Sequence, residues 1–179
     1  MSRTHLPLLL TILAAPLAAQ AAPDGPPPVR ATFALLDTSG SRIGQVTALQ
    51  DPQGVVLQVL ATHLSPGPHG MHLHATAACV PPTFASAGSH YNPAGRKHGR
   101  ENPEGPHVGD LPNLEVQPDS TGRAQVRIDG VTLTAGPHSI GVPGTAVVIH
   151  ASRDDGRTDP TGNAGGRLAC AVVATGPAQ

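Results

Sequence analysis

The chain has 179 residues, with 11 basic and 12 acidic side chains, a formal charge of −1 at neutral pH and only 2% aromatic residues. This length is that of one domain that can bury a real core. The nearly neutral charge balance lacks the basic surface that binding to nucleic acid or to an anionic membrane requires, so neither partner is expected.

The N-terminus is typical of an export signal. Arg3 precedes an apolar run over residues 6–19, and small residues follow as far as Ala21. Because this run is shorter than the roughly 20 apolar residues that span a bilayer, we expect a signal peptide over residues 1–21 that is cleaved after Ala21. Residues 22–29 are rich in proline and predict a disordered leader. The mature protein is therefore expected in the periplasm or outside the cell.

Residues 30–179 are predicted to form one all-β domain. The chain has 21 Gly and 20 Pro among short runs of Val, Ile, Leu and Thr, with no sustained helical periodicity. This pattern predicts antiparallel strands joined by turns, in a Greek-key barrel or sandwich. Turn sequences occur at 51–54 and 119–122. The expected strands are 30–36, 42–50, 54–63, 67–74, 122–128, 144–150 and 168–174.

Histidines on two of these strands suggest a metal site. Since side chains alternate along a strand, His72 and His74 point to the same face of the strand 67–74, whereas His69 points to the other face and is excluded from the pair. His150 ends another predicted strand. Imidazole ligands without thiolates suit copper, zinc or nickel, and copper has the highest affinity of the three.

The stretch 75–113 contains no predicted element but four more potential ligands, namely His90, His98, His107 and Asp110. A structureless loop of this length in a small domain is usually functional or disordered. Three nitrogens and one carboxylate form a set that zinc accepts in a tetrahedral site. The alternative is a histidine-rich loop that binds metals adventitiously, or histidines that only form hydrogen bonds. His63 and His138 lie outside both groups and are expected to be structural or surface residues.

Six short motifs occur in order along the chain. They are HGMHLH at 69–74, AGSHYNP at 87–93, RKHG at 96–99, HVGDLPN at 107–113, VVIH at 147–150 and TGNAGGRLAC at 161–170. Together they closely resemble the successive active-site motifs of copper/zinc superoxide dismutases of the bacterial exported type. The resemblance covers nearly the whole mature chain in collinear order.

The resemblance implies two metal sites that share one histidine. The copper ligands would be His72, His74, His90 and His150, and the zinc ligands would be His90, His98, His107 and Asp110. His90 would bridge the two metals as an imidazolate. Asp154 matches the family's aspartate that hydrogen-bonds one histidine of each site, here His72 and His98, which fits the need for a carboxylate to orient imidazole ligands. A solvated loop residue is the alternative for Asp154.

The resemblance also assigns Cys79, Cys170 and Arg167. The two cysteines are the only ones in the chain, and an exported pair is expected to be oxidised. The resemblance implies an intrachain disulfide between them, with a thiolate metal site as the competing interpretation. Arg167 matches the family's substrate-guiding arginine, which would hold a small anion beside the copper position; a surface salt bridge is the alternative.

The implied function is that of a superoxide dismutase, an antioxidant oxidoreductase. Two superoxide anions and two protons would give dioxygen and hydrogen peroxide, with copper cycling between Cu²⁺ and Cu⁺, a structural zinc, and His90 taking up and returning a proton. The family's fold is a barrel of about eight antiparallel strands with long metal-binding and electrostatic loops, and its members are monomers or dimers, so a homodimer is possible. The alternative function is an exported copper- and zinc-binding or storage protein without turnover. The complete ligand set together with Arg167 favours the enzyme.

Two features depart from the family pattern. Met71 stands where the family usually has phenylalanine, and it is expected to pack in the core. The stretch between His150 and Arg167 lacks the lysines and glutamates of many relatives, and the whole chain contains a single lysine, Lys97. The resemblance therefore leaves the electrostatic steering field of this chain open.

Overall fold

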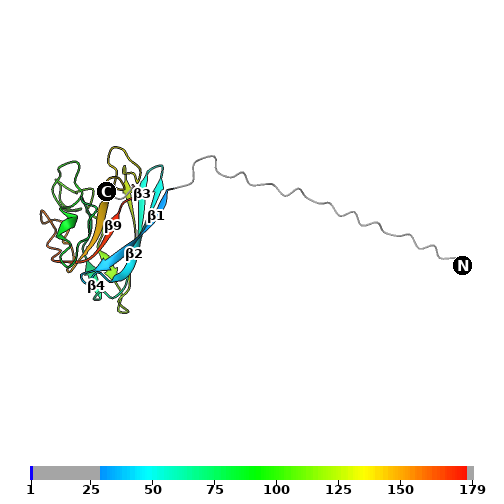
Figure 1. The fold of residues 1–179 in the computed structure, drawn as a ribbon, viewed down its shortest axis with the longest axis horizontal. Coiled ribbons are helices and arrows are strands. Elements are labelled where there is room, and N and C mark those ends of the chain that lie inside the picture. The colour runs from blue at the N-terminus through cyan, green and yellow to red at the C-terminus, as the bar shows by residue number, and fades with distance from the viewer. Residues whose placement is uncertain (2–28, 177–179) are drawn as a thin grey trace.

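The structure is a computed structural model that describes Met1 and residues 29–176 (Figure 1). The expected signal peptide beyond Met1 and the expected leader up to residue 28 lie outside the described residues. The described chain forms one antiparallel sheet that curls into a nearly closed barrel, so the expected all-β class is confirmed. Its nine strands are β1 Arg30–Asp37, β2 Arg42–Asp51, β3 Gly54–Ala61, β4 Gly67–His69, β5 Met71–His74, β6 Leu114–Val116, β7 Gly122–Asp129, β8 Thr145–His150 and β9 Arg167–Val173.

The order of the strands explains how the barrel closes. Neighbours in the sheet follow the order β4-β6-β7-β3-β2-β1-β9-β8-β5. The two end strands, β4 and β5, are consecutive in the chain and are separated only by Gly70. The first and the last strand of the sheet therefore meet at Gly70.

The prediction of one continuous strand over 67–74 is wrong, because the strand breaks at Gly70. The Gly70 amide donates a hydrogen bond to the Ser152 carbonyl, and the Gly70 carbonyl accepts one from the His150 amide, both at 2.8 Å. A Cβ at position 70 would lie 2.7 Å from Cβ of Ala164. Glycine is needed here because another segment of the chain approaches the backbone closely.

The sequence-based prediction also missed β6, which has only three residues and pairs with β4 and β7. Together with the break at Gly70, it raises the number of strands from the seven predicted ranges to nine, whereas the family resemblance implied about eight. The other predicted strands agree with the observed ones to within two residues at each end. The carboxylate of Asp51 accepts hydrogen bonds from the amides of Gln53 and Gly54, which confirms the turn at 51–54.

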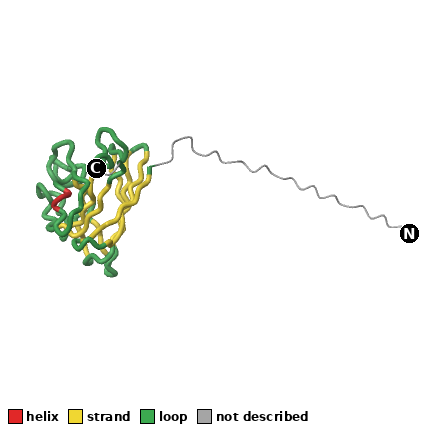
Figure 2. The backbone as a smooth tube through the Cα atoms, viewed as in Figure 1, coloured by secondary structure: helices red, strands yellow, loops and turns green. Residues whose placement is uncertain are grey.

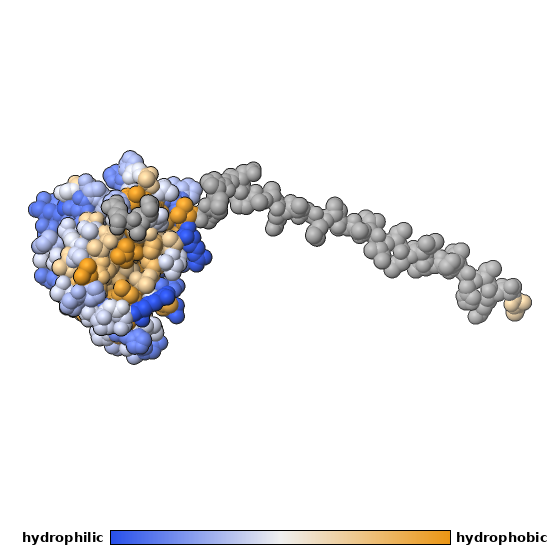
Figure 3. Space-filling view, viewed as in Figure 1, coloured by the Kyte–Doolittle hydropathy of each residue, from blue (hydrophilic) through white to orange (hydrophobic). Residues whose placement is uncertain are grey.

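The barrel interior is filled by alternate residues of the strands. Leu35, Val46, Leu57 and Ile149 are fully buried in the main apolar cluster, and so is Met71, which confirms its expected packing role. Figure 3 shows the outside of the domain, where apolar side chains gather over the region of β9 and hydrophilic ones lie towards the rim.

The long loops gather on one side of the strands (Figure 2). Within the stretch 75–113 the only regular element is a short 3₁₀ helix, η1 Ala85–Ala87, so the expected long loop is confirmed. A second loop joins β8 to β9 over residues 151–166. No helix in the described part of the chain is long and apolar enough to cross a membrane.

Candidate metal centre

Strands β5 and β8 bring the distant histidine motifs together. The two strands are paired, with His72 opposite Val148 and His74 opposite Ala146, and His150 ends β8. The long loop returns to β5, where His72 forms an isolated bridge with Asp110, and His74 forms one with His90. The backbone pairing therefore places side chains from β5, β8 and the loop in one buried region.

Four histidines form the first cluster, and all four are buried. Their ligand atoms lie within 4.8 Å of one another. One ring nitrogen of each has no hydrogen-bond partner among the described residues, namely Nδ1 of His72 and Nε2 of His74, His90 and His150. A buried polar atom without a partner costs about 1–3 kcal/mol, so four such nitrogens facing one point fit a bound metal ion. These are the four residues expected to bind copper.

The second ring nitrogen of three of these histidines is held by an acceptor. His74 Nδ1 donates to the Gly88 carbonyl at 2.8 Å, and His150 Nδ1 donates to the Gly165 carbonyl at 3.1 Å. His72 Nε2 donates to the carboxylate of Asp154 at 2.5 Å. These bonds leave the lone pair of the other nitrogen free to bind a metal ion.

The second cluster centres on Oδ1 of Asp110. The Nδ1 atoms of His90 and His98 lie 3.0 Å from this oxygen, and Nδ1 of His107 lies 3.1 Å from it. A ligand atom of His72 is also within 4.8 Å of His90, His98 and Asp110. However, His72 Nδ1 belongs to the first cluster and its Nε2 faces Asp154, so the second set is the three-nitrogen, one-oxygen set expected for zinc.

His90 is common to both clusters. Its Nε2 is one of the four nitrogens without a partner in the first cluster, and its Nδ1 is directed to Asp110 in the second. One imidazole therefore presents a nitrogen to each metal position, which is the arrangement that a bridging imidazolate requires.

Asp154 lies between the two clusters. Its carboxylate accepts hydrogen bonds from His72 Nε2 and, at 3.1 Å, from His98 Nε2. The amide of Gly156 donates to the same carboxylate. A Cβ at Gly162 would lie 2.0 Å from this carboxylate, so a residue with a side chain would displace it. The structure thus places Asp154 where the sequence analysis expected it.

Burial and the two aspartates set the charge state of the histidines. Burial lowers the pKa of His74 to about 2 and that of His150 to about 3, and it lowers the pKa of His90 to about 4 against the opposing effect of Asp110. Burial also favours a lower pKa for His98, but the hydrogen bonds to Asp110 and Asp154 outweigh this effect and raise the pKa of His98 to about 9.

The pKa values of the two aspartates themselves are lowered. Burial favours their protonated forms, but the hydrogen bonds from the histidines outweigh it for both Asp110 and Asp154. At neutral pH the metal-free site therefore offers neutral imidazoles at His74, His90 and His150 and ionised carboxylates at both aspartates, whereas His98 is protonated and would release its proton when a metal binds.

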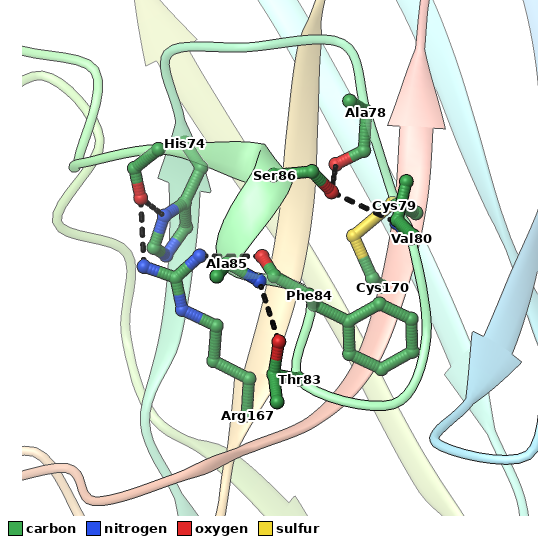
Figure 4. The surroundings of a disulfide bond; sticks show 11 residues. His74, Ala78, Cys79, Val80, Thr83, Phe84, Ala85, Ser86, Arg167 and Cys170 are labelled. Atoms are coloured by element: carbon green, nitrogen blue, oxygen red, sulfur yellow. Dashed lines mark hydrogen bonds between the residues drawn. A yellow bond between two sulfur atoms is a disulfide. The ribbon is translucent and has the colours of Figure 1, made fainter.

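Arg167 is fixed beside the first cluster by backbone carbonyls (Figure 4). One of its terminal nitrogens donates to the Phe84 carbonyl at 2.6 Å, and the other donates to the Gly88 carbonyl at 2.7 Å. The Gly88 carbonyl also accepts the hydrogen bond from His74. Arg167 has no carboxylate partner among the described residues, so the surface salt bridge is not the role that the structure gives it.

The disulfide lies next to this arrangement. Cys79 and Cys170 are bonded, which confirms the expected pair and removes the thiolate metal site. The bond ties the start of the long loop to β9, three residues after Arg167. Phe84 packs in a small apolar cluster with Cys170, as Figure 4 also shows, and this fixes the carbonyl that holds Arg167.

A hollow of about 480 Å³ opens onto the first cluster. Its lining includes His74, His90, His150 and Arg167, together with Pro160 and Thr161 from the second loop. Arg167 is the only charged residue other than histidine that lines it. A small anion that enters this hollow therefore meets the guanidinium group and the first cluster together.

Some contributors could not be recognised from residue types. The Gly88 and Gly165 acceptors are backbone carbonyls, which carry no signal in a sequence. His69 belongs to neither cluster, as strand parity predicted, yet its Nδ1 donates to the His150 carbonyl at 2.7 Å. His63 and His138 are exposed and lie outside both clusters.

Comparison with known proteins agrees with this geometry. The model of the copper/zinc superoxide dismutase family matches residues 42–173. The Aquifex aeolicus protein "Superoxide dismutase [Cu-Zn] 2" is 42% identical over 148 residues, which are 81% of this chain and 86% of the relative. The Deinococcus radiodurans protein "Superoxide dismutase [Cu-Zn]" is 37% identical over 177 residues, which are 92% of this chain and 94% of the relative.

Solved structures give the same result. The crystal structure of a superoxide dismutase-like protein from Bacillus subtilis has a TM-score of 0.75 at 34% identity, covering 79% of this chain and 97% of that one. The Cu/Zn superoxide dismutase from Brucella abortus has a TM-score of 0.65 at 27% identity, covering 81% and 99%. Sequence motifs, fold and metal-ligand geometry therefore agree, and the chain belongs to the copper/zinc superoxide dismutase family.

Proposed function

We propose that this protein dismutates superoxide, with copper held by the first cluster and zinc held by the second. The observation that carries the proposal is the set of four buried imidazole nitrogens that have no hydrogen-bond partner in the described part of the chain. They lie beside a three-nitrogen, one-oxygen set that shares His90 with them. Family membership supplies copper and zinc as the metals that fit these donors.

The residues of the site have distinct roles in this reaction. The first cluster would hold copper, which would supply one-electron redox chemistry when bound, and the second cluster would hold a zinc ion that does not change its oxidation state. The guanidinium of Arg167 attracts the anion into the hollow, and two of its five N–H donors are engaged by carbonyls, so others remain for the substrate. Nε2 of His90 would take up one proton when it is not bound to copper and would deliver it to the second superoxide. Solvent would supply the other proton, so that the first superoxide leaves as dioxygen and the second as hydrogen peroxide.

The direct test is superoxide decay by stopped flow, with the rate normalised to bound copper. The protein loaded with both metals should be much faster than the same concentration of free copper, and it should keep its rate when a chelator is added. A slow rate at full metal occupancy would move the function to metal binding or storage.

Arg167→Ala tests the substrate-guiding role. We expect the rate to fall by about tenfold or more at low ionic strength, because electrostatic steering contributes about 10–10³-fold to association. Arg123→Ala removes the same charge from the outer face of β7 and should leave the rate nearly unchanged. Metal content should be the same in both variants. Equal rates in Arg167→Ala and in the unmodified protein would show that Arg167 does not guide the substrate.

We also propose that the protein is exported to the periplasm or the cell exterior. The support is the signal-like sequence of residues 1–21 and the Cys79–Cys170 disulfide, since disulfides persist in oxidising compartments. Cell fractionation should place the protein outside the cytoplasm, and its N-terminal sequence should begin at Ala22. A cytoplasmic protein that begins at residue 1 or 2 would contradict this.

The proposed assembly is a homodimer, as the family range allows. Apolar side chains gathered over the region of β9 support it (Figure 3). Sedimentation velocity of the metal-loaded mature protein distinguishes a monomer, which is lighter than the 18.1 kDa of the full chain, from a dimer of twice the monomer mass.

A further inference from the structure

A second hollow lies beside Asp154. It has a volume of about 370 Å³, and its lining includes Arg100, Asn113, Arg153 and Asp154. None of its lining residues lines the hollow that contains Arg167. Arg100 follows the His98 motif in the long loop, and Arg153 precedes Asp154 in the loop after β8. The hollow is therefore formed where the two metal-centre loops meet.

The floor of this hollow is held by hydrogen bonds between the two loops. The Glu101 amide donates to the Gly156 carbonyl at 2.9 Å. Asn113 donates through Nδ2 to the Asp154 carbonyl at 3.0 Å and accepts at Oδ1 from the Asp154 amide at 2.9 Å. Because these contacts use backbone groups on both loops, the positions from which Arg100 and Arg153 extend are fixed.

The acidic residues of the hollow already have partners. Glu101 forms an ion pair with Arg157 at 2.8 Å. Asp155 accepts hydrogen bonds from the amides of Arg157 and Thr158 and from two side chains. Asp154 is engaged by the metal-centre histidines. The acids of the hollow are therefore occupied by groups other than its two lining arginines.

The two arginines differ from these acids. Arg100 and Arg153 are exposed, and within the described residues neither side chain forms a hydrogen bond or an ion pair. Each guanidinium offers five N–H donors in a planar fork. One fork is enough for the two oxygens of a carboxylate, whereas a phosphate group has further oxygens outside that plane for a second fork.

We infer that Arg100 and Arg153 form a binding site for a phosphate group. The occupant is a phosphate dianion, free or as an ester, that accepts hydrogen bonds from both side chains. Bound there, it joins the two loops that hold His98 and Asp154. Leu111 and Pro112 supply an apolar wall, and the volume leaves room for an organic substituent on the phosphate. The site does not depend on superoxide turnover.

The test is a titration of the copper- and zinc-loaded protein with inorganic phosphate. In the reduced, diamagnetic protein, the amide resonances of Glu101, Asn113 and Gly156 should shift and saturate. Arg100→Gln and Arg153→Gln should each raise the apparent Kd by at least about tenfold, since hydrogen bonds to charged groups are worth that much. Acetate should bind at least about tenfold more weakly than phosphate.

Two controls separate this site from other arginines. Arg30 and Arg123 also line one hollow together, on the outer face of the sheet, and the double variant Arg30→Gln/Arg123→Gln should leave phosphate binding unchanged. Arg167→Gln should leave the shifts at Asn113 and Gly156 intact. The inference is overturned if these shifts are absent, if the double variant weakens binding equally, or if Arg167→Gln abolishes it.

A vesicle-binding assay distinguishes a lipid headgroup from a soluble phosphate ligand. Binding to phosphatidic acid vesicles that is lost in Arg100→Gln and in Arg153→Gln identifies a lipid headgroup. Binding of free phosphate without binding to these vesicles identifies a soluble ligand. Absence of both overturns the site.

Discussion

At the scale of single residues, the metal centre depends on acceptors that fix the imidazole rings. Backbone carbonyls hold His74 and His150, whereas a side chain, Asp154, holds His72 and also His98. One carboxylate thus orients a histidine of each cluster. A substitution at this single position acts on both metal sites, although it removes no expected metal ligand.

Asp154→Asn tests this link. An amide has one acceptor oxygen, and its NH₂ group would face a ring N–H, so one of the two histidines loses its acceptor. We expect the affinity for metal to fall by about 10–100-fold, as for other residues that orient ligands. Competition with a chelator measures the affinity for each metal. The control variant Asp155→Asn removes the same charge at the neighbouring position, but Asp155 contacts no histidine, so this variant should keep the normal affinity for metal. Equal losses of metal affinity in both variants would contradict the role of Asp154.

At the scale of elements, the break between β4 and β5 lets the loop after β8 approach the strand. Gly70→Ala would place a methyl group 2.7 Å from Cβ of Ala164. We expect the free energy of unfolding to fall by about 1–3 kcal/mol, the usual cost of overpacking. Gly166→Ala is the matched control, because a Cβ there meets nothing within 4 Å. Urea denaturation measures the free energy of unfolding of both variants. An unchanged free energy of unfolding in Gly70→Ala would show that the loop can move away.

The disulfide connects two elements that are 91 positions apart in the sequence. Replacing both cysteines with alanine should lower the free energy of unfolding by about 2–5 kcal/mol, because the unfolded chain regains conformational freedom. The variant should also lose activity at temperatures where it stays folded, since the Phe84 and Gly88 carbonyls that hold Arg167 lie on the freed loop. Denaturation and stopped-flow assays measure the two effects. A loss below about 1 kcal/mol would contradict the prediction.

At the scale of the whole molecule, the metal-free protein is expected to lose stability in mild acid. The pKa values of His74, His90 and His150 are lowered to about 2, 4 and 3, so these groups stay neutral in the folded state. In the unfolded chain they bind protons below about pH 6.5. The unfolded state then binds more protons, and the free energy of unfolding falls as the pH falls from about 6.5 towards 4.

His98 acts in the opposite direction at higher pH. Its pKa is raised to about 9, so its contribution to stability is complete below about pH 6.5 and is lost as the pH rises through 9. The stability of the metal-free protein should therefore be highest near pH 6.5. Urea unfolding in steps from about pH 9 to about pH 4 tests this. A constant or rising stability between pH 6.5 and 4 would contradict it.

The sequence by itself determined the fold class and most strand positions, and its resemblance to the copper/zinc superoxide dismutases named the residues that are expected to bind metals. Alternation along strands and turn residues are local, so ranges such as 42–50 could be predicted from neighbouring residues alone. The ligand residues could be named because their motifs are short and occur in order. Parity separated His69 from His72 and His74, although the strand that was assumed to carry all three is broken at Gly70.

Only the tertiary structure decided which atoms meet. The break at Gly70 depends on Ala164 and Ser152, and β6 depends on pairing with β4, so neither feature has a local signal. The nitrogen that each histidine directs to a metal is set by its acceptor on another segment, such as Gly88, Gly165 or Asp154. The hollow between Arg100 and Arg153 likewise exists only where two loops meet. Backbone periodicity is encoded in neighbouring residues, whereas hydrogen bonds between distant segments arise only when the chain has folded.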